Sequence, residues 1–236
     1  MSGKNPSSAK SEGASGVFDI AAERQRKAVS MAAPYVREEA LESALLAPHF
    51  KPAEQEAIHR ALEFLRNAKL VGREPNYMGH AVRVAVFYRN YTKSPTAQGV
   101  VLGLLHNVLE VTATPASDIQ KQFGKWILEG CQSLVVDRER QKNDADYMAR
   151  YYGKLKTACD EVQQIKIFDK LDNLLVLFLN PSAETRRQYL AEIRDCLLSL
   201  VATQLPALVP VFGELIAEAQ NMPHQTLAEF LSRNPS

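Results

Sequence analysis

The chain has 236 residues, of which 46% are hydrophobic and 23% are charged, and its formal net charge is +1. This composition is ordinary for a globular protein with a sizeable core, and the charge gives no reason to expect a surface that binds nucleic acid. The N-terminus lacks the apolar run of a signal peptide. The most apolar windows, near Leu174–Leu179 and Leu197–Phe212, are too short or too interrupted to span a bilayer. We therefore expect a cytoplasmic protein with no membrane or nucleic-acid partner.

The three cysteines, Cys131, Cys159 and Cys196, are widely spaced, and none has a CxxC partner. An odd number without paired spacing is typical of reduced thiols and not of a disulfide framework. We expect all three to be reduced thiols in the core of a cytoplasmic protein.

The chain begins with a segment that has almost nothing to bury. Met1–Gly16 is rich in Ser, Gly and Lys, so residues 1–17 are predicted to be a disordered tail. From Phe18 onward the pattern is helical, and residues 18–236 are predicted to form one domain. The first helices are expected at Ala21–Ala33, Arg37–Leu46 and Ala53–Ala68, with Leu70–Asn76 as a loop.

The middle of the chain carries two strongly apolar helices. One is predicted at Tyr77–Tyr91 and the next at Ala97–Glu110, capped by Ser94 or Thr96. No run of alternating residues predicts a sheet, so the fold class is predicted to be all-α. The remaining helices are expected to be a short one containing Phe123, then Trp126–Val136, Asp144–Cys159, Glu161–Leu179, Thr185–Thr203, Leu208–Gln220 and Thr226–Ser232, with Val135–Asn143 as a charged connection.

Three of these apolar helices each carry a potential metal ligand. They are His80, His106 and Asp169. If all three face inward, two imidazoles and one carboxylate suit a divalent ion such as Mn²⁺, Fe²⁺ or Zn²⁺. Such an ion could polarise a phosphoryl oxygen and lower the pKa of a water molecule.

Other polar residues near these positions could complete a phosphate-processing site. Glu110 lies one turn after His106 and could orient or deprotonate a water. Asn173 lies one turn after Asp169 and could hold a substrate group. The cations that could receive phosphates are Lys166 and Lys170, which flank Asp169, and Arg66, Lys69 and Arg73, which precede the first histidine.

A purely structural role is the alternative at each of these positions. A lone histidine on an apolar helix is more often a satisfied core residue than a ligand. Asp169 and Asp172 could be solvated helix charges paired with Lys166 and Lys170. Spacing by itself therefore leaves the metal site open.

The segments REPNYMGHAVRVA (Arg73–Ala85), GLLHNVLEVT (Gly103–Thr112) and IKIFDKLDNL (Ile165–Leu174) resemble three motifs of the HD-domain superfamily. The likeness is to the hydrolase domain of RelA/SpoT-type (p)ppGpp enzymes and their small stand-alone relatives. It runs from about Leu62 to about Leu179, and the third segment is the most specific, since its lysine, aspartate and asparagine all fall in register. The resemblance implies an all-α HD-domain helical bundle.

The resemblance also implies roles for individual residues. Members of that family use Mn²⁺ and remove a pyrophosphate from the ribose 3′ position of guanosine nucleotides. The expected metal ligands are His80, His106, Asn107 and Asp169, the expected catalytic residues are Glu110 and Asn107, and the expected substrate-binding residues are Arg73, Lys166 and Asn173.

The sequence departs from the family pattern at two places. Asn107 stands where the signature aspartate is expected, and Val111 stands where a second acidic residue is expected. A neutral amide weakens attraction to a dication, and valine cannot hold a water. Three explanations fit. The domain could keep the fold and have lost the hydrolase activity, or it could be a divergent hydrolase in which Glu110, Asp172 or another acid takes the role of the missing one. Asn107 could also be an engineered substitution, but the second departure at Val111 favours natural change.

The functional hypotheses are accordingly three. The first is a metal-dependent phosphohydrolase that acts on a nucleotide or related phosphorylated small molecule, with (p)ppGpp 3′-pyrophosphate hydrolysis as the specific case. The second is a catalytically impaired HD module that binds a nucleotide or a protein partner. The third is a structural helical domain with fortuitous similarity. The flanking helices Ala21–Leu46 and Leu208–Ser232 could cover the bundle or form a homodimer face. A synthetase domain would need β-strands, and the sequence after Leu179 predicts only helices, so synthesis of (p)ppGpp is not expected.

Overall fold

The computed structural model describes residues 17–33, 39–46, 50–71 and 77–234. The described residues form helices and no strand, which confirms the all-α prediction, and one isolated antiparallel bridge pairs Leu70 with Thr112. Of the predicted tail, only Val17 lies within the described residues, where it is exposed. The α-helices are α1 (Ile20–Ala32), α2 (Glu39–Leu45), α3 (Pro52–Asn67), α4 (Tyr77–Tyr91), α5 (Ala97–Leu105), α6 (Val108–Val111), α7 (Ala116–Leu134), α8 (Arg138–Asn143), α9 (Tyr147–Leu155), α10 (Asp160–Leu174), α11 (Ala183–Glu192), α12 (Leu198–Gln204), α13 (Val209–Asn221) and α14 (Leu227–Arg233).

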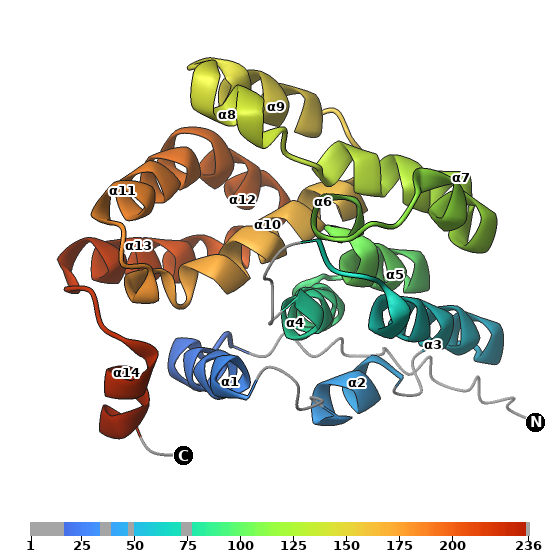
Figure 1. The fold of residues 1–236 in the computed structure, drawn as a ribbon, viewed down its shortest axis with the longest axis horizontal. Helices are drawn as coiled ribbons and strands as arrows, with labels where there is room; N and C mark the ends of the chain where they lie inside the picture. The colour runs from blue at the N-terminus through green and yellow to red at the C-terminus, as the bar shows by residue number, and fades with distance from the viewer. Residues whose placement is uncertain (1–16, 34–38, 47–49, 72–76, 235–236) are drawn as a thin grey trace, which may run out of the picture.

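The bundle is built around α4, which packs against α5 and α10, while α3 covers α5 (Figure 1). Every residue of α5 except Gln98 is buried. Gly103 allows this close packing, since a Cβ there would lie 3.0 Å from Ala85 Cα on α4 and 3.0 Å from Ile165 Cδ1 on α10. The consequence is that the ends of α5, α4 and α10 meet closely, where the predicted metal ligands lie.

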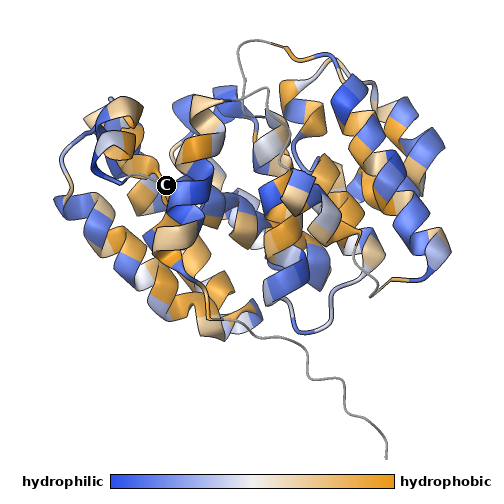
Figure 2. Ribbon diagram, turned by 90° about the horizontal axis from the view of Figure 1, so that it is seen from below, coloured by the Kyte–Doolittle hydropathy of each residue, from blue (hydrophilic) through white to orange (hydrophobic). Residues whose placement is uncertain are grey.

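The C-terminal helices close the other side of α10. Helices α12 and α13 both pack against α10, and α14 packs against α1 (Figure 1). A small second core forms there from Ala28, Phe178 and Phe230. Figure 2 shows hydrophilic and hydrophobic residues on the same helices, as expected where one face of each helix is buried.

The predicted helix Ala97–Glu110 is interrupted in the structure. Helix α5 ends at Leu105, and α6 begins at Val108 after a turn at His106 and Asn107. Asn107 has φ −112° and ψ 8°, outside the helical region. Apolar periodicity continues through the turn, so the sequence pattern did not reveal it. As a result, Asn107 and Glu110 do not lie on a continuation of helix α5.

Other predicted boundaries also need correction. The predicted connection Val135–Asn143 contains helix α8, because the Asp137 side chain caps it by accepting hydrogen bonds from the backbone nitrogens of Glu139 and Arg140. The predicted helix Glu161–Leu179 ends at Leu174 as α10, and a 3₁₀ turn follows at Leu177–Leu179.

Two further helix predictions differ in their boundaries. The two helices expected around Phe123 and Trp126 form α7, whose backbone leaves helical geometry at Gly124 (φ 86°). The helix expected at Asp144–Cys159 is confined to Tyr147–Leu155 as α9.

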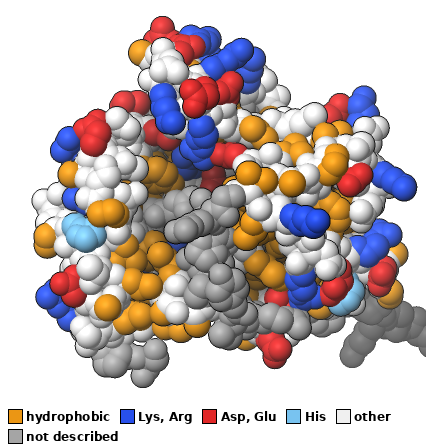
Figure 3. All heavy atoms as spheres, in the orientation of Figure 1, with side chains coloured by type: hydrophobic (Ala, Val, Ile, Leu, Met, Phe, Trp, Pro, Cys, Tyr) orange, Lys and Arg blue, Asp and Glu red, His pale blue; other side chains and the backbone are white. Residues whose placement is uncertain are grey.

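The cysteine prediction is correct in one part and wrong in another. All three thiols are free, but only Cys131 is buried, whereas Cys159 is exposed at the start of α10 and Cys196 is half-buried. Within the described segments, none of the helices has the length and apolar character needed to cross a membrane. Charged side chains gather over the end of the molecule formed by α8 and α9 (Figure 3).

Candidate metal centre

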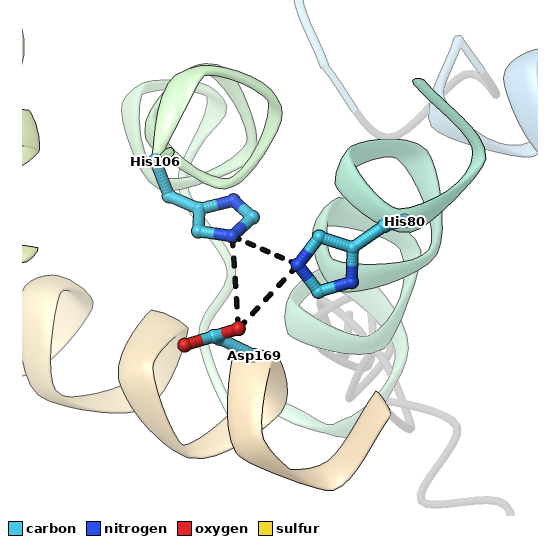
Figure 4. A group of neighbouring side chains, drawn as sticks. All are labelled: His80, His106 and Asp169. Atoms are coloured by element: carbon cyan, nitrogen blue, oxygen red, sulfur yellow. Dashed lines mark hydrogen bonds and ion pairs between the residues drawn. The ribbon is translucent and has the colours of Figure 1, made fainter. Parts of the chain in front are cut away.

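His80, His106 and Asp169 come together from three helices, and we call them the triad. His80 lies in the first turn of α4, His106 follows the last residue of α5, and Asp169 lies in the middle of α10 (Figure 4). Their ligand atoms all lie within 4.8 Å of one another. The structure thus brings together the three residues that spacing and resemblance had singled out.

The distances within the triad suit a shared cation. The two Nε2 atoms lie 3.2 Å apart, and Asp169 Oδ1 lies 3.4 Å from His80 Nε2 and 3.9 Å from His106 Nε2. Two ligands bonded at about 2.1 Å to one ion lie about 3.0–3.4 Å apart in octahedral or tetrahedral geometry. Two of the three separations match that range, and the third needs a shift of about half an ångström.

Hydrogen bonds to Nδ1 fix which ring nitrogen of each histidine faces the triad. His106 Nδ1 lies 2.7 Å from the carbonyl oxygen of Gly103, and His80 Nδ1 lies 2.7 Å from Asp172 Oδ2. Both partners are acceptors, so in the neutral rings Nδ1 carries the hydrogen and Nε2 carries the lone pair. In metalloproteins an acceptor that binds the outer N–H of a histidine in this way orients the ring and leaves its other nitrogen free for the metal.

The electrostatics of the triad favour an ionised carboxylate and one neutral imidazole. Burial, followed by the nearby charge of His80, lowers the pKa of His106 to about 4. Burial would raise the pKa of Asp169, but Lys166 and the two histidines hold that pKa well below its usual range. Burial would lower the pKa of His80, but hydrogen bonds and charges from Asp169 and Asp172 raise it. At neutral pH the triad therefore offers at least one lone pair and one negative charge to a cation.

Asn107, the departure from the family pattern, lies beside the triad with an unsatisfied oxygen. Its Oδ1 is buried and has no hydrogen-bond partner among the described residues. A buried acceptor without a partner costs free energy, and a cation or a water would satisfy it. The two imidazole nitrogens and the carboxylate of the triad are donors that fit a borderline divalent ion, and an amide oxygen is a compatible neutral donor.

A pocket of about 1040 Å³ opens onto the triad. Its volume is at the upper end of the range for small-molecule sites. The other predicted site residues that the structure describes all line it, namely Asn107, Glu110, Lys166 and Asn173. Val111 lines it as well, so the second departure from the family pattern also faces the same space.

The predicted substrate-binding residues on α10 both contact Asp169. Lys166 Nζ lies 3.0 Å from Asp169 Oδ2, and Asn173 Nδ2 donates to Asp169 Oδ1 at 3.1 Å. Lys170 instead pairs with Glu192 at 2.6 Å. Arg73, the third predicted substrate-binding residue, lies outside the described residues.

Two other cations lie away from the pocket. Arg66 pairs with Glu42 and Glu63, and Lys69 lines a separate groove of about 670 Å³ along α3. Neither residue lines the pocket at the triad, so the structure does not bring them together with Lys166 and Lys170.

Glu110, the predicted water-handling acid, is held by a residue that the sequence did not single out. Arg138, at the start of α8, contacts Glu110 Oε1 through Nε at 2.8 Å and Nη2 at 2.6 Å. The Arg138 side chain is 59% exposed and that of Glu110 is 19% exposed. Burial lowers the pKa of Arg138, but the charge and hydrogen bonds of Glu110 outweigh this and raise it.

Asp172 is the second residue whose role the sequence did not reveal. The expectation of a solvated charge paired with a neighbouring lysine is wrong, because Asp172 is fully buried and contacts Lys27 of α1, Arg83 of α4 and His80. Arg83 lies three residues after His80 and Asp172 three after Asp169, which places each pair on one helix face. That spacing was the available signal; nothing local pointed to Lys27.

Comparisons with known proteins agree with this fold. No protein-family model matches the chain. A curated relative, the guanosine-3′,5′-bis(diphosphate) 3′-pyrophosphohydrolase MESH1 of Drosophila melanogaster, is 29% identical over 121 residues, which is 49% of this chain and 66% of that protein. The match thus spans just under two thirds of the relative's length.

A solved structure is also similar. It is described as a metazoan ortholog of SpoT that hydrolyses ppGpp and plays a role in starvation responses, and it matches with a TM-score of 0.58 at 19% identity, covering 75% of this chain and 100% of that one. The chain therefore has an HD-domain fold like that of the ppGpp hydrolases, as its three motifs predicted.

Proposed function

We propose that the chain is a divalent-metal-dependent phosphohydrolase that acts on a phosphorylated nucleotide. The observation that carries this proposal is that His80 Nε2, His106 Nε2 and Asp169 lie together in one pocket, while a hydrogen-bond acceptor faces Nδ1 of each histidine. A structural core histidine has no need for such a paired orientation. The cation we propose is Mn²⁺, held by His80, His106 and Asp169, with Asn107 Oδ1 as a neutral fourth donor.

The chemistry follows from what each side chain can do. A divalent cation supplies Lewis-acid polarisation of a phosphoryl oxygen and lowers the pKa of water. Glu110 accepts a proton from the attacking water or orients it, while Arg138 holds the Glu110 carboxylate in place. Asn173 and Lys166, one turn either side of Asp169, orient the phosphate group that is transferred to water.

The specific reaction we propose is removal of the 3′-pyrophosphate from ppGpp. Water attacks the phosphorus that is bonded to the ribose 3′ oxygen, and the bond between that phosphorus and the 3′ oxygen breaks. The 3′ oxygen takes up a proton and becomes the 3′ hydroxyl of GDP, while the released pyrophosphate carries the oxygen of the water. This choice rests on the activity named for the relatives and on the three segments that resemble the motifs of the (p)ppGpp hydrolases. The pocket supports an anionic ligand, because Arg138 and Lys142 of α8 line it together with the α10 lysines.

An impaired enzyme that binds a nucleotide without turning it over is the second candidate, and one observation favours it. Val111 lines the pocket where a second acid is expected, and Glu110 is already occupied by Arg138. If water handling fails, the pocket still has the groups needed to bind a phosphorylated ligand.

The test is turnover of ppGpp with added Mn²⁺, followed by chromatography of the nucleotide product and assay of released pyrophosphate. GTP, GDP and a 3′-phosphorylated adenosine nucleotide are run in parallel to define the substrate class. We expect release of pyrophosphate in the wild type and none in Asp169→Ala. Binding of ppGpp by calorimetry without turnover would favour the impaired enzyme, and neither binding nor turnover of any nucleotide would contradict both proposals.

A further inference from the structure

Asp172 lies directly behind one ring of the triad. Its Oδ2 is 2.7 Å from His80 Nδ1, and its side chain is fully buried. We propose that Asp172 is a positioning residue that fixes His80 in the tautomer able to bind a cation, and that Lys27 and Arg83 hold Asp172 in place. The inference rests on the proposed function for its meaning, but its geometry can be tested without turnover.

Each oxygen of the Asp172 carboxylate has a defined partner. Oδ1 accepts from Arg83 Nε at 2.8 Å. Oδ2 accepts from Lys27 Nζ at 2.6 Å and, at 3.5 Å, from Arg83 Nη2, in addition to His80 Nδ1. Lys27 Nζ also donates to the backbone oxygen of Asp172 at 2.6 Å. A carboxylate can only accept, so the ring nitrogen that faces it must carry a hydrogen, which leaves Nε2 free to bind a cation.

Two competing acceptors face the other nitrogen of the same ring. His106 Nε2 lies 3.2 Å and Asp169 Oδ1 lies 3.4 Å from His80 Nε2, and both contacts are longer than the 2.7 Å to Asp172. Without Asp172, a hydrogen on Nε2 would point at Asp169 and block the position of the cation. The shorter bond to Asp172 therefore decides the tautomer of His80.

The two histidines of the triad differ in how their outer partner is held. His106 bonds to the carbonyl of Gly103 within α5, which the helix itself positions. His80 bonds to a side chain on another helix, and that side chain is held by Lys27 from α1 and Arg83 from α4. Helix α1 lies outside the region of family resemblance. The contact of Lys27 with Asp172 therefore connects an N-terminal helix to the metal centre.

The decisive variant is Lys27→Met/Asp172→Asn. The amide has one oxygen and one nitrogen. Arg83 donates to Oδ1 through Nε at 2.8 Å and to Oδ2 through Nη2 only at 3.5 Å, and guanidinium cannot accept, so the closer arginine contact selects the amide oxygen at the position of Oδ1. The amide oxygen therefore faces Arg83, and the amide nitrogen faces His80 Nδ1 and donates to it. His80 must then move its hydrogen to Nε2. Removing Lys27 at the same time avoids an ammonium facing the amide nitrogen and removes one charge of each sign.

The tautomer is read by long-range ¹H–¹⁵N NMR of the histidine rings in metal-free protein, at a pH above the titration of His80 measured in the same experiment. We expect a hydrogen on Nδ1 of His80 in the wild type and in Lys27→Met, and a hydrogen on Nε2 in the double variant. His106 should keep its hydrogen on Nδ1 in all three. A hydrogen on His80 Nε2 in the wild type, or no change in the folded double variant, would overturn the proposal.

A titration with Mn²⁺ alone links the tautomer to the metal centre. We expect the double variant to bind Mn²⁺ about 10–100-fold more weakly than the wild type, which is the usual loss when a residue that hydrogen-bonds to a metal ligand is removed. Glu42→Gln is the matched control, because it removes another buried carboxylate, paired with Arg66, that does not line the pocket. If the wild type binds no Mn²⁺, the proposed function fails, while the NMR measurement still decides whether Asp172 sets the tautomer.

Discussion

On the triad side of the pocket the polar groups have close partners, whereas on the side formed by α6 and α8 one polar group has a mostly exposed partner and another has none among the described residues. His80 and His106 each have an acceptor 2.7 Å from Nδ1. Asp169 contacts Lys166 and Asn173, and behind His80 lies a buried carboxylate with two buried cations. Such a network rigidifies the groups that it joins.

The α6–α8 side has a different character. Asn107 Oδ1 has no partner among the described residues, Glu110 is held by an arginine that is mostly exposed, and Val111 offers no polar atom. Exposed ion pairs of this kind contribute little to stability. We infer that the triad side is the more rigid of the two, and variants on each side test this difference separately.

The largest expected effect is on the support of the triad side. Arg83→Gln leaves the buried Asp172 with one cation fewer, and we expect the free energy of unfolding to fall by about 3 kcal/mol or more, as for other broken buried ion pairs. Urea denaturation of the metal-free protein measures it. A loss below about 1 kcal/mol would place this pair with the exposed ones and remove the contrast between the two sides.

Loss of a triad ligand should come next. We expect His106→Ala to weaken Mn²⁺ binding by more than about 100-fold, because loss of a ligand should cost more affinity than loss of a residue that only hydrogen-bonds to a ligand. Calorimetry measures the affinity, and His224→Ala, which removes an exposed histidine outside the pocket, is the control. Equal affinity in His106→Ala and wild type would mean that the triad does not hold the cation.

Glu110, on the α6–α8 side, should affect turnover without affecting cation binding. We expect Glu110→Gln to lower kcat about 100-fold, the lower range for loss of a general base, with unchanged Mn²⁺ affinity. Glu129→Gln, an exposed glutamate on α7, serves as control. A matching loss of Mn²⁺ affinity would make Glu110 a ligand, and an unchanged kcat would mean that another group handles the water.

Restoring the expected aspartate should strengthen cation binding. We expect Asn107→Asp to raise Mn²⁺ affinity about tenfold, about 1.4 kcal/mol, because a charged oxygen replaces a neutral one in the donor set. Asn221→Asp makes the same change in net charge at an exposed position on α13. If both variants bind Mn²⁺ equally, the oxygen at position 107 does not face the cation.

The smallest effect should come from Arg138. Its side chain is 59% exposed, so we expect Arg138→Gln to change the free energy of unfolding by less than about 1 kcal/mol and to leave Mn²⁺ affinity unchanged. Urea denaturation under the conditions used for Arg83→Gln gives the direct comparison. A loss as large as that of the buried arginine would show that the α6–α8 side is as firmly held as the triad side.

Much of the fold followed from the sequence because most helices have a clear apolar face. The bounds of α4 were predicted to the residue, and the Thr96 cap of α5 was among the two expected. The break at His106 and Asn107 was missed because apolar residues continue on both sides of it. Helix α8 was missed because none of its residues is buried.

The triad was predicted from its residue types and motif positions, but its support was not. Asp172 looked like a surface charge because its neighbours in sequence include two lysines, whereas its partners Lys27 and Arg83 are 145 and 89 residues away. The contact between Glu110 and Arg138 depends on the turn before α6 and on α8, both of which the pattern concealed. Long-range contacts between charged residues carry no local signal.

The most direct test of the central claim is anomalous diffraction from crystals of the wild-type protein grown or soaked with Mn²⁺. We predict one strong anomalous peak within bonding distance of His80 Nε2, His106 Nε2 and an oxygen of Asp169, with the Asn107 side chain beside it. Absence of a peak at the triad under saturating Mn²⁺, or a peak held by other residues, would contradict the account of this site as a metal centre.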